Sequence, residues 1–320
     1  MPLRLATLAV AVLLAPLAAA APGVPPSGKV LLGVVGPDPE AFDRVTGRHH
    51  PLHVMFGEWT RQLPELLATE RAAGRLPVLS VRMSNAPLDV ARGAEDARWV
   101  TLSQTLNEAQ QTIWVRLFPE MTGSWNPYCA FDEAGRSRGA RYATSAFIAA
   151  FRRVAIILDG GPRARLNAKL HAAGLAGLRG GTNLPASGRI AIVWNPQGHG
   201  VPDIAANGPQ AYWPGPGYVD IVANDLYSDS GEPSWQGMDT LYAYGKPYLV
   251  AEWALEAEDD PAWAQRMFDW VASHPRTIGL VYFNKGWSGG DSVYELRGKP
   301  RSLALYKSAI RNPRYVSTLP

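Results

Sequence analysis

The chain has a single cysteine, Cys129, among its 320 residues. One cysteine excludes an internal disulfide, so the fold must be stabilised by the burial of apolar side chains. The sequence also lacks an apolar run of the roughly 20 residues that a membrane-spanning helix needs. A shorter apolar run, Leu5 to Leu17, follows Arg4 and precedes small residues up to Ala21. This pattern predicts a signal peptide over residues 1–21 and a secreted or periplasmic protein without a membrane span.

An excess of one charge is also missing, since 31 Lys and Arg face 28 Asp and Glu, for a net charge of +3. The arginines are scattered, which argues against a nucleic-acid partner. No phosphate-binding glycine loop, Rossmann fingerprint or Gly-x-Ser-x-Gly elbow is present. His49, His50 and His53 cluster without acidic or cysteine partners at ligand spacing, so no metal or organic cofactor is implied. Because no linker or repeat divides residues 22–320, we expect one domain. We also expect the protein to be a monomer.

Eight short runs rich in Val, Ile and Leu are continuous rather than alternating, which is typical of parallel strands covered by helices. They lie at residues 30–35, 53–56 (the weakest), 76–81, 113–118, 190–194, 219–226, 248–251 and 278–283. Segments with helical spacing include 63–67, 147–158, 260–275 (with Asp260 as N-cap) and 302–310. About eight alternations of strand and helix favour a single-domain α/β fold, the (β/α)₈ TIM barrel. Residues 159–188 are expected to form a loop-rich insertion.

Two glutamates end apolar strands, and in such a barrel the active site forms at the carboxyl ends of the strands. Glu120 follows the run from Trp114 to Pro119, and Glu252 follows the run from Pro247 to Ala251. Strand side chains alternate, so we expect Arg116, Phe118 and Glu120 to share the inward face, and likewise Tyr248, Val250 and Glu252. Either glutamate alone would more simply be a surface ion-pair partner. Together they match glycosidases, which need two carboxylates facing one bond.

These residues also carry a resemblance. The segment Arg116 to Trp125, R-L-F-P-E-M-T-G-S-W, resembles the acid/base motif of glycoside hydrolase family 26, in which an arginine-bearing strand leads to His-Glu-Met-Asn-Gly and a tryptophan. Further similar segments follow in the same order from the fourth to the eighth strand. They are Tyr212 to Gly215, Tyr218 to Val222, Asp225 to Tyr227, Lys246 to Glu252, and Tyr282 to Asn284 followed by Trp287.

The resemblance implies a retaining endo-β-glycanase acting on a β-linked polysaccharide such as mannan or β-glucan. Glu120 matches the family's acid/base, Glu252 its nucleophile and Tyr227 the tyrosine that orients the nucleophile. The family's histidine before the acid/base is Pro119 here, and its Met-Asn-Gly asparagine is Thr122. These departures bear on the identity of the substrate more than on the class of reaction, because both carboxylates remain.

Several further side chains near predicted strand ends are expected to bind substrate. For the aromatic ones the reason is that flat rings match the apolar faces of sugars. The substrate-binding set is Arg116, Trp125, Trp194, Asp225, Tyr227 and Trp287. Core packing is the alternative for each tryptophan. Asp225 is expected either to contact substrate or to support a polar layer in the barrel. Glu58, at the end of the weakest strand, is the rival carboxylate.

Two other functions stay open. Pro119 and Thr122 motivate a barrel that binds an exopolysaccharide with little or no hydrolysis. A transglycosylase acting on a cell-surface polymer of the producing cell is the third alternative.

Overall fold

The computed structural model describes residues 21–57, 62–179, 181, 183–285 and 293–320. Eight parallel strands form the centre of the molecule, and nearly all of their side chains are buried because helices cover them outside and side chains fill the barrel inside. The strands are β1 (Val30–Val35), β2 (Leu52–Phe56), β3 (Leu76–Val81), β4 (Ile113–Leu117), β5 (Ile190–Trp194), β6 (Ile221–Tyr227), β7 (Tyr248–Ala254) and β8 (Thr277–Phe283).

The sheet closes on itself because β1 pairs with both β2 and β8. Every neighbouring pair is parallel, and a short ninth strand, β9 (Tyr315–Val316), adds to β1 near the chain end. Glycine lets the strands pack tightly inside: a Cβ on Gly33 would lie 2.7 Å from Val281 Cγ2 and 2.9 Å from Leu52 Cβ. The predicted (β/α)₈ barrel is confirmed.

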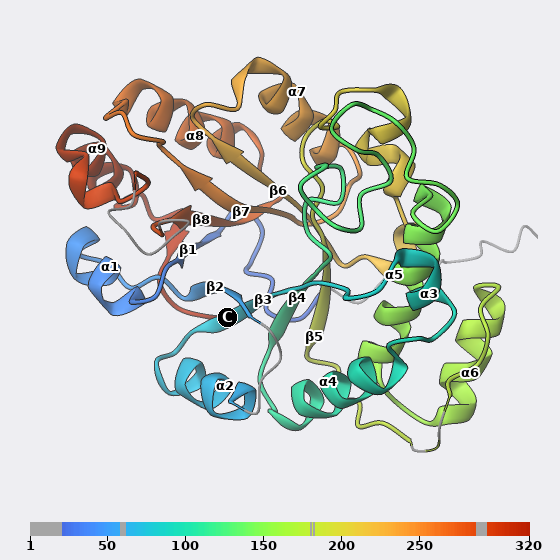
Figure 1. Ribbon diagram of the computed structural model, residues 1–320. Coiled ribbons are helices and arrows are strands. Elements are labelled where there is room, and N and C mark those ends of the chain that lie inside the picture. Colours follow the sequence, from blue (N-terminus) through green and yellow to red (C-terminus); the bar gives the residue numbers. More distant parts are fainter. Residues whose placement is uncertain (1–20, 58–61, 180, 182, 286–292) are drawn as a thin grey trace, which may run out of the picture.

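Helices surround the barrel, as Figure 1 shows. They are α1 (Pro39–Thr46), α2 (Leu63–Ala72), α3 (Pro87–Ala91), α4 (Asp96–Glu108), α5 (Thr144–Asp159), α6 (Arg163–Ala172), α7 (Gly231–Tyr242), α8 (Pro261–Ser273) and α9 (Pro300–Ala309). The predicted start of α8 is confirmed, since Asp260 accepts hydrogen bonds from the amides of Ala262 and Trp263, both at 3.0 Å. No helix in the described ranges is long and apolar enough to cross a membrane.

The segment 159–188 differs from the expected loop-rich insertion, because α6 forms within it and packs beside α5. Only Leu166 and Leu170 of α6 are buried, so its apolar stripe is two residues long. Such a stripe is too short to be recognised from spacing alone.

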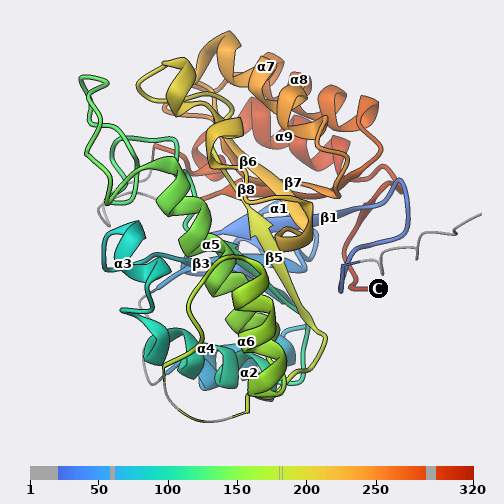
Figure 2. The same cartoon turned by 90° about the vertical axis from the view of Figure 1, so that its right-hand side faces the viewer.

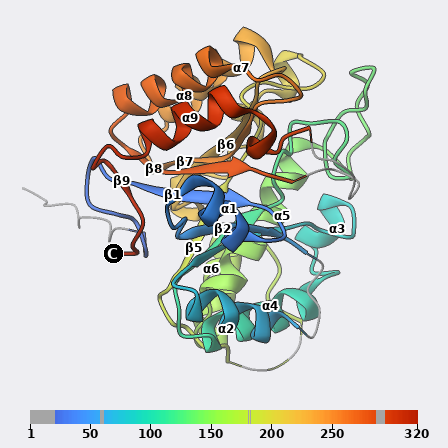
Figure 3. The same ribbon diagram turned by 90° about the vertical axis from the view of Figure 1, so that its left-hand side faces the viewer.

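A long loop joins β4 to α5 at the carboxyl ends of the strands. Drawn in green, it projects from the barrel on the side away from the C-terminus in two opposite views (Figures 2 and 3). It begins at Phe118 and includes Glu120 and Trp125, so this loop brings one of the predicted carboxylates to the barrel's open end.

Candidate active site

Glu252, on β7, lies inside the barrel and is held by groups from two other strands, β4 and β6. Arg116 Nη1 on β4 donates to Glu252 Oε1 at 2.5 Å, and the Tyr227 hydroxyl on β6 donates to Glu252 Oε2 at 2.6 Å. Burial and the charge of Glu252 raise the pKa of Tyr227 well above its ordinary value, so this phenol stays a donor. Both carboxylate oxygens are therefore fixed before any ligand arrives.

The inward position of Glu252 depends on an irregularity in β7. Asn224 of β6 pairs with Val250, but the next residue, Asp225, pairs with Glu252, so Ala251 is an extra residue in β7. A bulge of this kind exchanges the two faces of a strand. The expectation that Tyr248 shares the face of Glu252 is therefore wrong: Tyr248 packs outward against Tyr242 and Trp270, on α7 and α8.

Glu120 reaches the same end of the barrel by irregular backbone rather than by strand alternation. The strand β4 stops at Leu117, and both Phe118 and Glu120 have positive φ, 51° and 55°. Phe118 consequently turns outward and packs against Trp99, Phe147 and Phe151, which corrects the expectation that it faces inward. The Glu120 amide donates to the Asn195 carbonyl at 2.6 Å, which ties this turn to the end of β5.

The side chain of Glu120 lies between two nitrogen donors. The indole Nε1 of Trp125 donates to Glu120 Oε2 at 2.9 Å, and Gln197 Nε2 donates to Glu120 Oε1 at 2.5 Å. Burial and the nearby charge of Glu252 raise the pKa of Glu120, against the lowering effects of Trp125, Arg116 and Arg82. A carboxyl with a raised pKa is suited to act as a general acid.

Thr122, one of the departures from the family motif, has a clear structural role. Its hydroxyl accepts a hydrogen bond from the Gln197 amide at 3.1 Å, and its carbonyl accepts from the Val201 amide at 2.9 Å. Pro119 contributes its carbonyl, which accepts from the Tyr128 hydroxyl at 2.6 Å. Both residues therefore help to fix the turn that carries Glu120.

Arg116 and Asp225 support the site from below. Arg116 Nη2 donates to Asp225 Oδ2 at 2.7 Å, and Asn195 Nδ2 donates to the same oxygen at 2.9 Å. Both charged side chains are 0% exposed, so the expected direct contact with substrate is corrected to a supporting role, the second alternative for Asp225. Burial disfavours a charged Arg116, but Asp225 and Glu252 outweigh it and raise the pKa of the guanidinium.

Trp194 does not reach the site. It is completely buried and packs against Trp213 and Tyr244, with ring centroids 4.8 and 5.2 Å away. Its neighbour Asn195 faces the barrel interior, so alternation turns Trp194 to the helix layer. The expectation that Trp194 binds substrate is therefore wrong. Trp125, in contrast, is 52% exposed beside Glu120.

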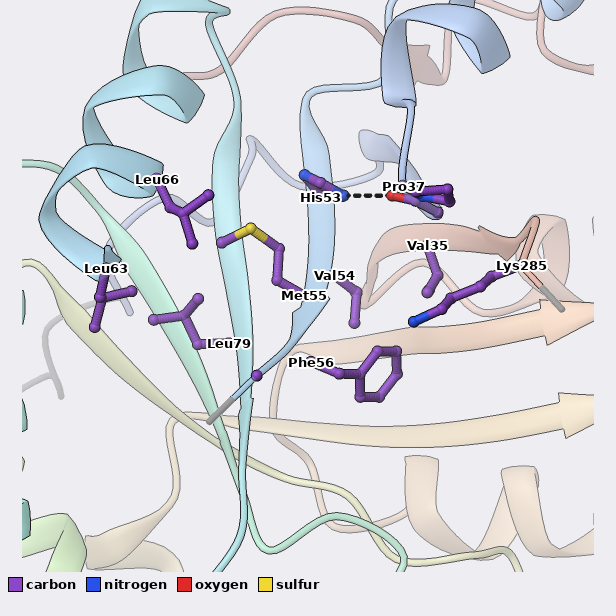
Figure 4. Close-up of a pocket in the computed structure, with 12 residues that line it drawn as sticks. Val35, Pro37, His53, Val54, Met55, Phe56, Leu63, Leu66, Leu79 and Lys285 are labelled. Carbon is purple, nitrogen blue, oxygen red and sulfur yellow. Dashed lines mark hydrogen bonds between the residues drawn. The ribbon is translucent and has the colours of Figure 1, made fainter. Parts of the chain in front are cut away.

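A hollow of about 250 Å³ opens beside the site at the carboxyl ends of β1 and β2 (Figure 4). Phe56, 41% exposed, stands at its edge, and Lys285 points toward this ring with Nζ 5.8 Å from the ring centroid. The Arg116 guanidinium carbon lies 6.0 Å from the same ring, which connects the hollow to the carboxylate network. No sequence motif singles out Phe56 or Gln197, although Phe56 ends a predicted strand.

Two expected residues, Glu58 and Trp287, lie outside the described residues, as do residues 1–20 of the expected signal peptide. Among the residues that are described, no group of three or more His, Cys, Asp or Glu is arranged to hold a metal ion.

The sequence was compared with protein families and with curated proteins. No protein-family model matches the chain. It is 25% identical over 240 residues to Endoglucanase H of Acetivibrio thermocellus, a match that covers 70% of this chain and 23% of that protein. The chain thus spans about a quarter of the length of this curated relative.

Solved structures match over nearly the whole chain. The YdhT protein from Bacillus subtilis has a TM-score of 0.61 at 15% identity, covering 92% of this chain and 88% of that one. The GH26 β-mannanase BoMan26A from Bacteroides ovatus has a TM-score of 0.59 at 14% identity, with 90% of each chain covered. A Cellulomonas fimi endo-β-1,4-mannanase variant has a TM-score of 0.60 at 15% identity, covering 91% and 72%. The chain therefore has the fold of the glycoside hydrolase family 26 mannanases, and the resemblance that its motifs suggested is confirmed at the level of the fold.

Proposed function

We propose that this protein is a retaining endo-β-glycanase that cleaves a β-linked polysaccharide of the mannan or β-glucan type. One observation carries the proposal: Glu120 and Glu252 approach the same end of the barrel, and their surroundings differ in the way that two catalytic roles require. The similarity to an endoglucanase and to β-mannanases supports the substrate class.

In the first step, the Glu252 carboxylate attacks the anomeric carbon while the bond to the leaving oxygen breaks and Glu120 gives that oxygen its proton. Arg116 and Tyr227 hold Glu252 in place for the attack. The glycosyl ester has no charge on Glu252, so the electrostatic resistance to ionising Glu120 falls. In the second step, Glu120 takes a proton from water, the water oxygen bonds to the anomeric carbon, and Glu252 leaves.

Substrate binding in this proposal uses the exposed rings beside the two carboxylates. Trp125 lies beside Glu120. Phe56, at the end of β2, lies beside Arg116, which binds Glu252. Flat rings of this kind offer apolar area to the axial hydrogens of a pyranose. Residues 1–21 would direct export, so the substrate would be met outside the cytoplasm as a polymer, by a monomeric enzyme.

The test is hydrolysis of a panel of mannan, β-glucan and xylan by the wild-type protein and by Glu120→Gln and Glu252→Gln. We expect turnover of at least one polymer by the wild type alone, and NMR of the first products should show the β-anomer, since double displacement retains configuration. Turnover that survives either substitution would refute the assigned roles, and an inverted first product would refute the retaining mechanism. Binding without hydrolysis would favour a polysaccharide-binding barrel, and chain rearrangement a transglycosylase.

A further inference from the structure

The two donors on Glu120 differ in their chemistry. An indole N–H can only donate a hydrogen bond, so Trp125 always requires an unprotonated Glu120 Oε2. A primary amide has a donor and an acceptor of nearly the same shape, so a half-turn of the Gln197 amide exchanges one for the other without moving the side chain. Glu120 Oε1 is thus the oxygen whose partner can suit both protonation states.

The backbone around Gln197 is fixed by contacts with two other segments. Its backbone amide donates to the Thr122 hydroxyl at 3.1 Å. The next residue, Gly198, presses against α7, because a Cβ on Gly237 would lie 2.3 Å from the Gly198 carbonyl oxygen. These contacts fix the loop after β5 relative to the turn that carries Glu120. Rotation of the Gln197 side-chain amide is then enough to exchange its donor for its acceptor.

We propose that Gln197 is a positioning residue of the acid/base: its amide donates to Glu120 Oε1 when the carboxylate is ionised, and it accepts from the proton on that oxygen until the leaving oxygen of the substrate takes its place as the acceptor. The inference rests on the proposed function and deepens it. Because Trp125 occupies Oε2, the proton is stored on Oε1. The leaving oxygen must therefore approach Glu120 from the side of Gln197.

The charged and titratable groups that act on Glu120 come from five parts of the fold. There are six such groups. They are Glu252 on β7, Arg116 on β4, Arg82 after β3, Tyr128 in the loop after β4, and Asp225 and Tyr227 on β6. None of them hydrogen-bonds to Glu120 in the described structure, so Gln197 and Trp125 are the groups whose removal changes its hydrogen bonding directly.

The experiment replaces Gln197 by methionine, which keeps the length of the side chain but has neither amide group. Methionine removes both hydrogen bonds, but the one to the charged carboxylate is the stronger, so its loss raises the pKa of Glu120. In protein labelled with ¹³C at the glutamate carboxyls, we expect the titration midpoint of Glu120, assigned with Glu120→Gln, to rise by about one pH unit. The alkaline limb of kcat/KM on soluble mannan or β-glucan should rise with it, since that limb reports the acid in the free enzyme. Gln197→Glu should raise the midpoint further, because two carboxyls would then share one proton.

The matched control is Gln236→Met, the same change at an exposed position on α7, which should leave both readouts unchanged. A merely structural role for Gln197 would lower kcat/KM equally at every pH, and that result would overturn the proposal. So would an unmoved carboxyl midpoint in both Gln197 variants. If no polymer is hydrolysed by the wild type, the proposed function fails, while the carboxyl titration still decides whether Gln197 governs the protonation of Glu120.

Discussion

The two carboxylates at the end of this barrel are placed by opposite means. Glu252 belongs to a regular strand with one bulge, is 5% exposed in its side chain, and faces a guanidinium and a phenol. Glu120 stands on left-handed backbone beyond the end of β4, is partly buried, and meets only uncharged N–H donors among the described residues. One is fixed by a buried ion pair and the other by a loop.

This difference supports the chemical roles proposed for the two side chains. A carboxylate that accepts hydrogen bonds from a buried cation and a phenol is fixed in position, which suits a nucleophile. A carboxyl near a second negative charge, hydrogen-bonded to neutral partners, has a raised pKa and can exchange a proton. The assignment can be broken by experiments that affect one glutamate and spare the other.

The largest difference should appear with a substrate whose leaving group needs no proton, such as a dinitrophenyl β-glycoside. Glu252→Ala should be inactive on it, because no glycosyl ester can form. Glu120→Ala should still release a burst of dinitrophenol and then turn over about 10² to 10⁴ times more slowly than the wild type, the usual contribution of a general base. Stopped-flow absorbance measures both phases.

External azide sharpens this comparison, because it can attack the glycosyl ester without a general base. It should accelerate Glu120→Ala with retention of configuration, whereas any azide product of Glu252→Ala should be inverted, because azide then replaces the missing nucleophile in a single displacement. Rescue of Glu252→Ala with retention of configuration would contradict the roles assigned to the two glutamates.

The second largest effect is expected for Arg116→Met, which leaves Asp225 and Glu252 buried without their cation. Breaking a buried ion pair from one side costs about 3–5 kcal/mol, so denaturant unfolding should show a loss of stability of that size at neutral pH. The loss should shrink as the pH falls, since burial raises the pKa of Asp225 and protonation removes its unpaired charge. Arg136→Met is the matched control, because its ion pair with Asp132 is exposed and should contribute little to stability.

A smaller effect is expected for Tyr227→Phe, which removes one hydrogen bond to Glu252 and keeps the ring. A hydrogen bond to a charged group contributes about 1.5–3 kcal/mol, so kcat/KM should fall by roughly 10- to 150-fold. Tyr242→Phe on α7, whose hydroxyl accepts from the Arg276 amide, tests whether loss of any tyrosine hydroxyl has this effect. An equal loss of kcat/KM in the two variants would contradict the proposed role of the Tyr227 hydroxyl in holding Glu252.

The barrel is well predicted from the sequence, because continuous apolar runs such as 30–35 and 278–283 fit few structures besides a strand covered on both faces. Both glutamates are expected at strand ends. Glu252 lies within β7, two residues before its end, and Glu120 lies three residues beyond the end of β4. The expected alternation is nevertheless wrong, since Phe118 and Tyr248 point outward. The bulge in β7 and the positive φ angles of Phe118 and Glu120 depend on tertiary packing. The alternation of apolar residues in the sequence does not predict them.

Side chains from distant segments are harder to predict for the same reason. Gln197 approaches Glu120 only because the loop after β5 docks on Thr122 and α7, contacts that no local pattern encodes. The prediction for Trp194 fails because a tryptophan at a strand end has the same local sequence signature whether it faces the barrel or the helices.

The smallest effect concerns the second donor on Glu120. Trp125→Phe keeps an exposed ring for stacking and removes only the indole N–H on Oε2. Loss of this donor raises the pKa of Glu120, so the alkaline limb of kcat/KM should move to higher pH. Because Trp125 is 52% exposed, water replaces much of the lost hydrogen bond, and the shift should be smaller than that of Gln197→Met. A pH profile of both variants on one substrate measures the order; a larger shift for Trp125→Phe would mean that Oε2, not Oε1, is the oxygen that delivers the proton.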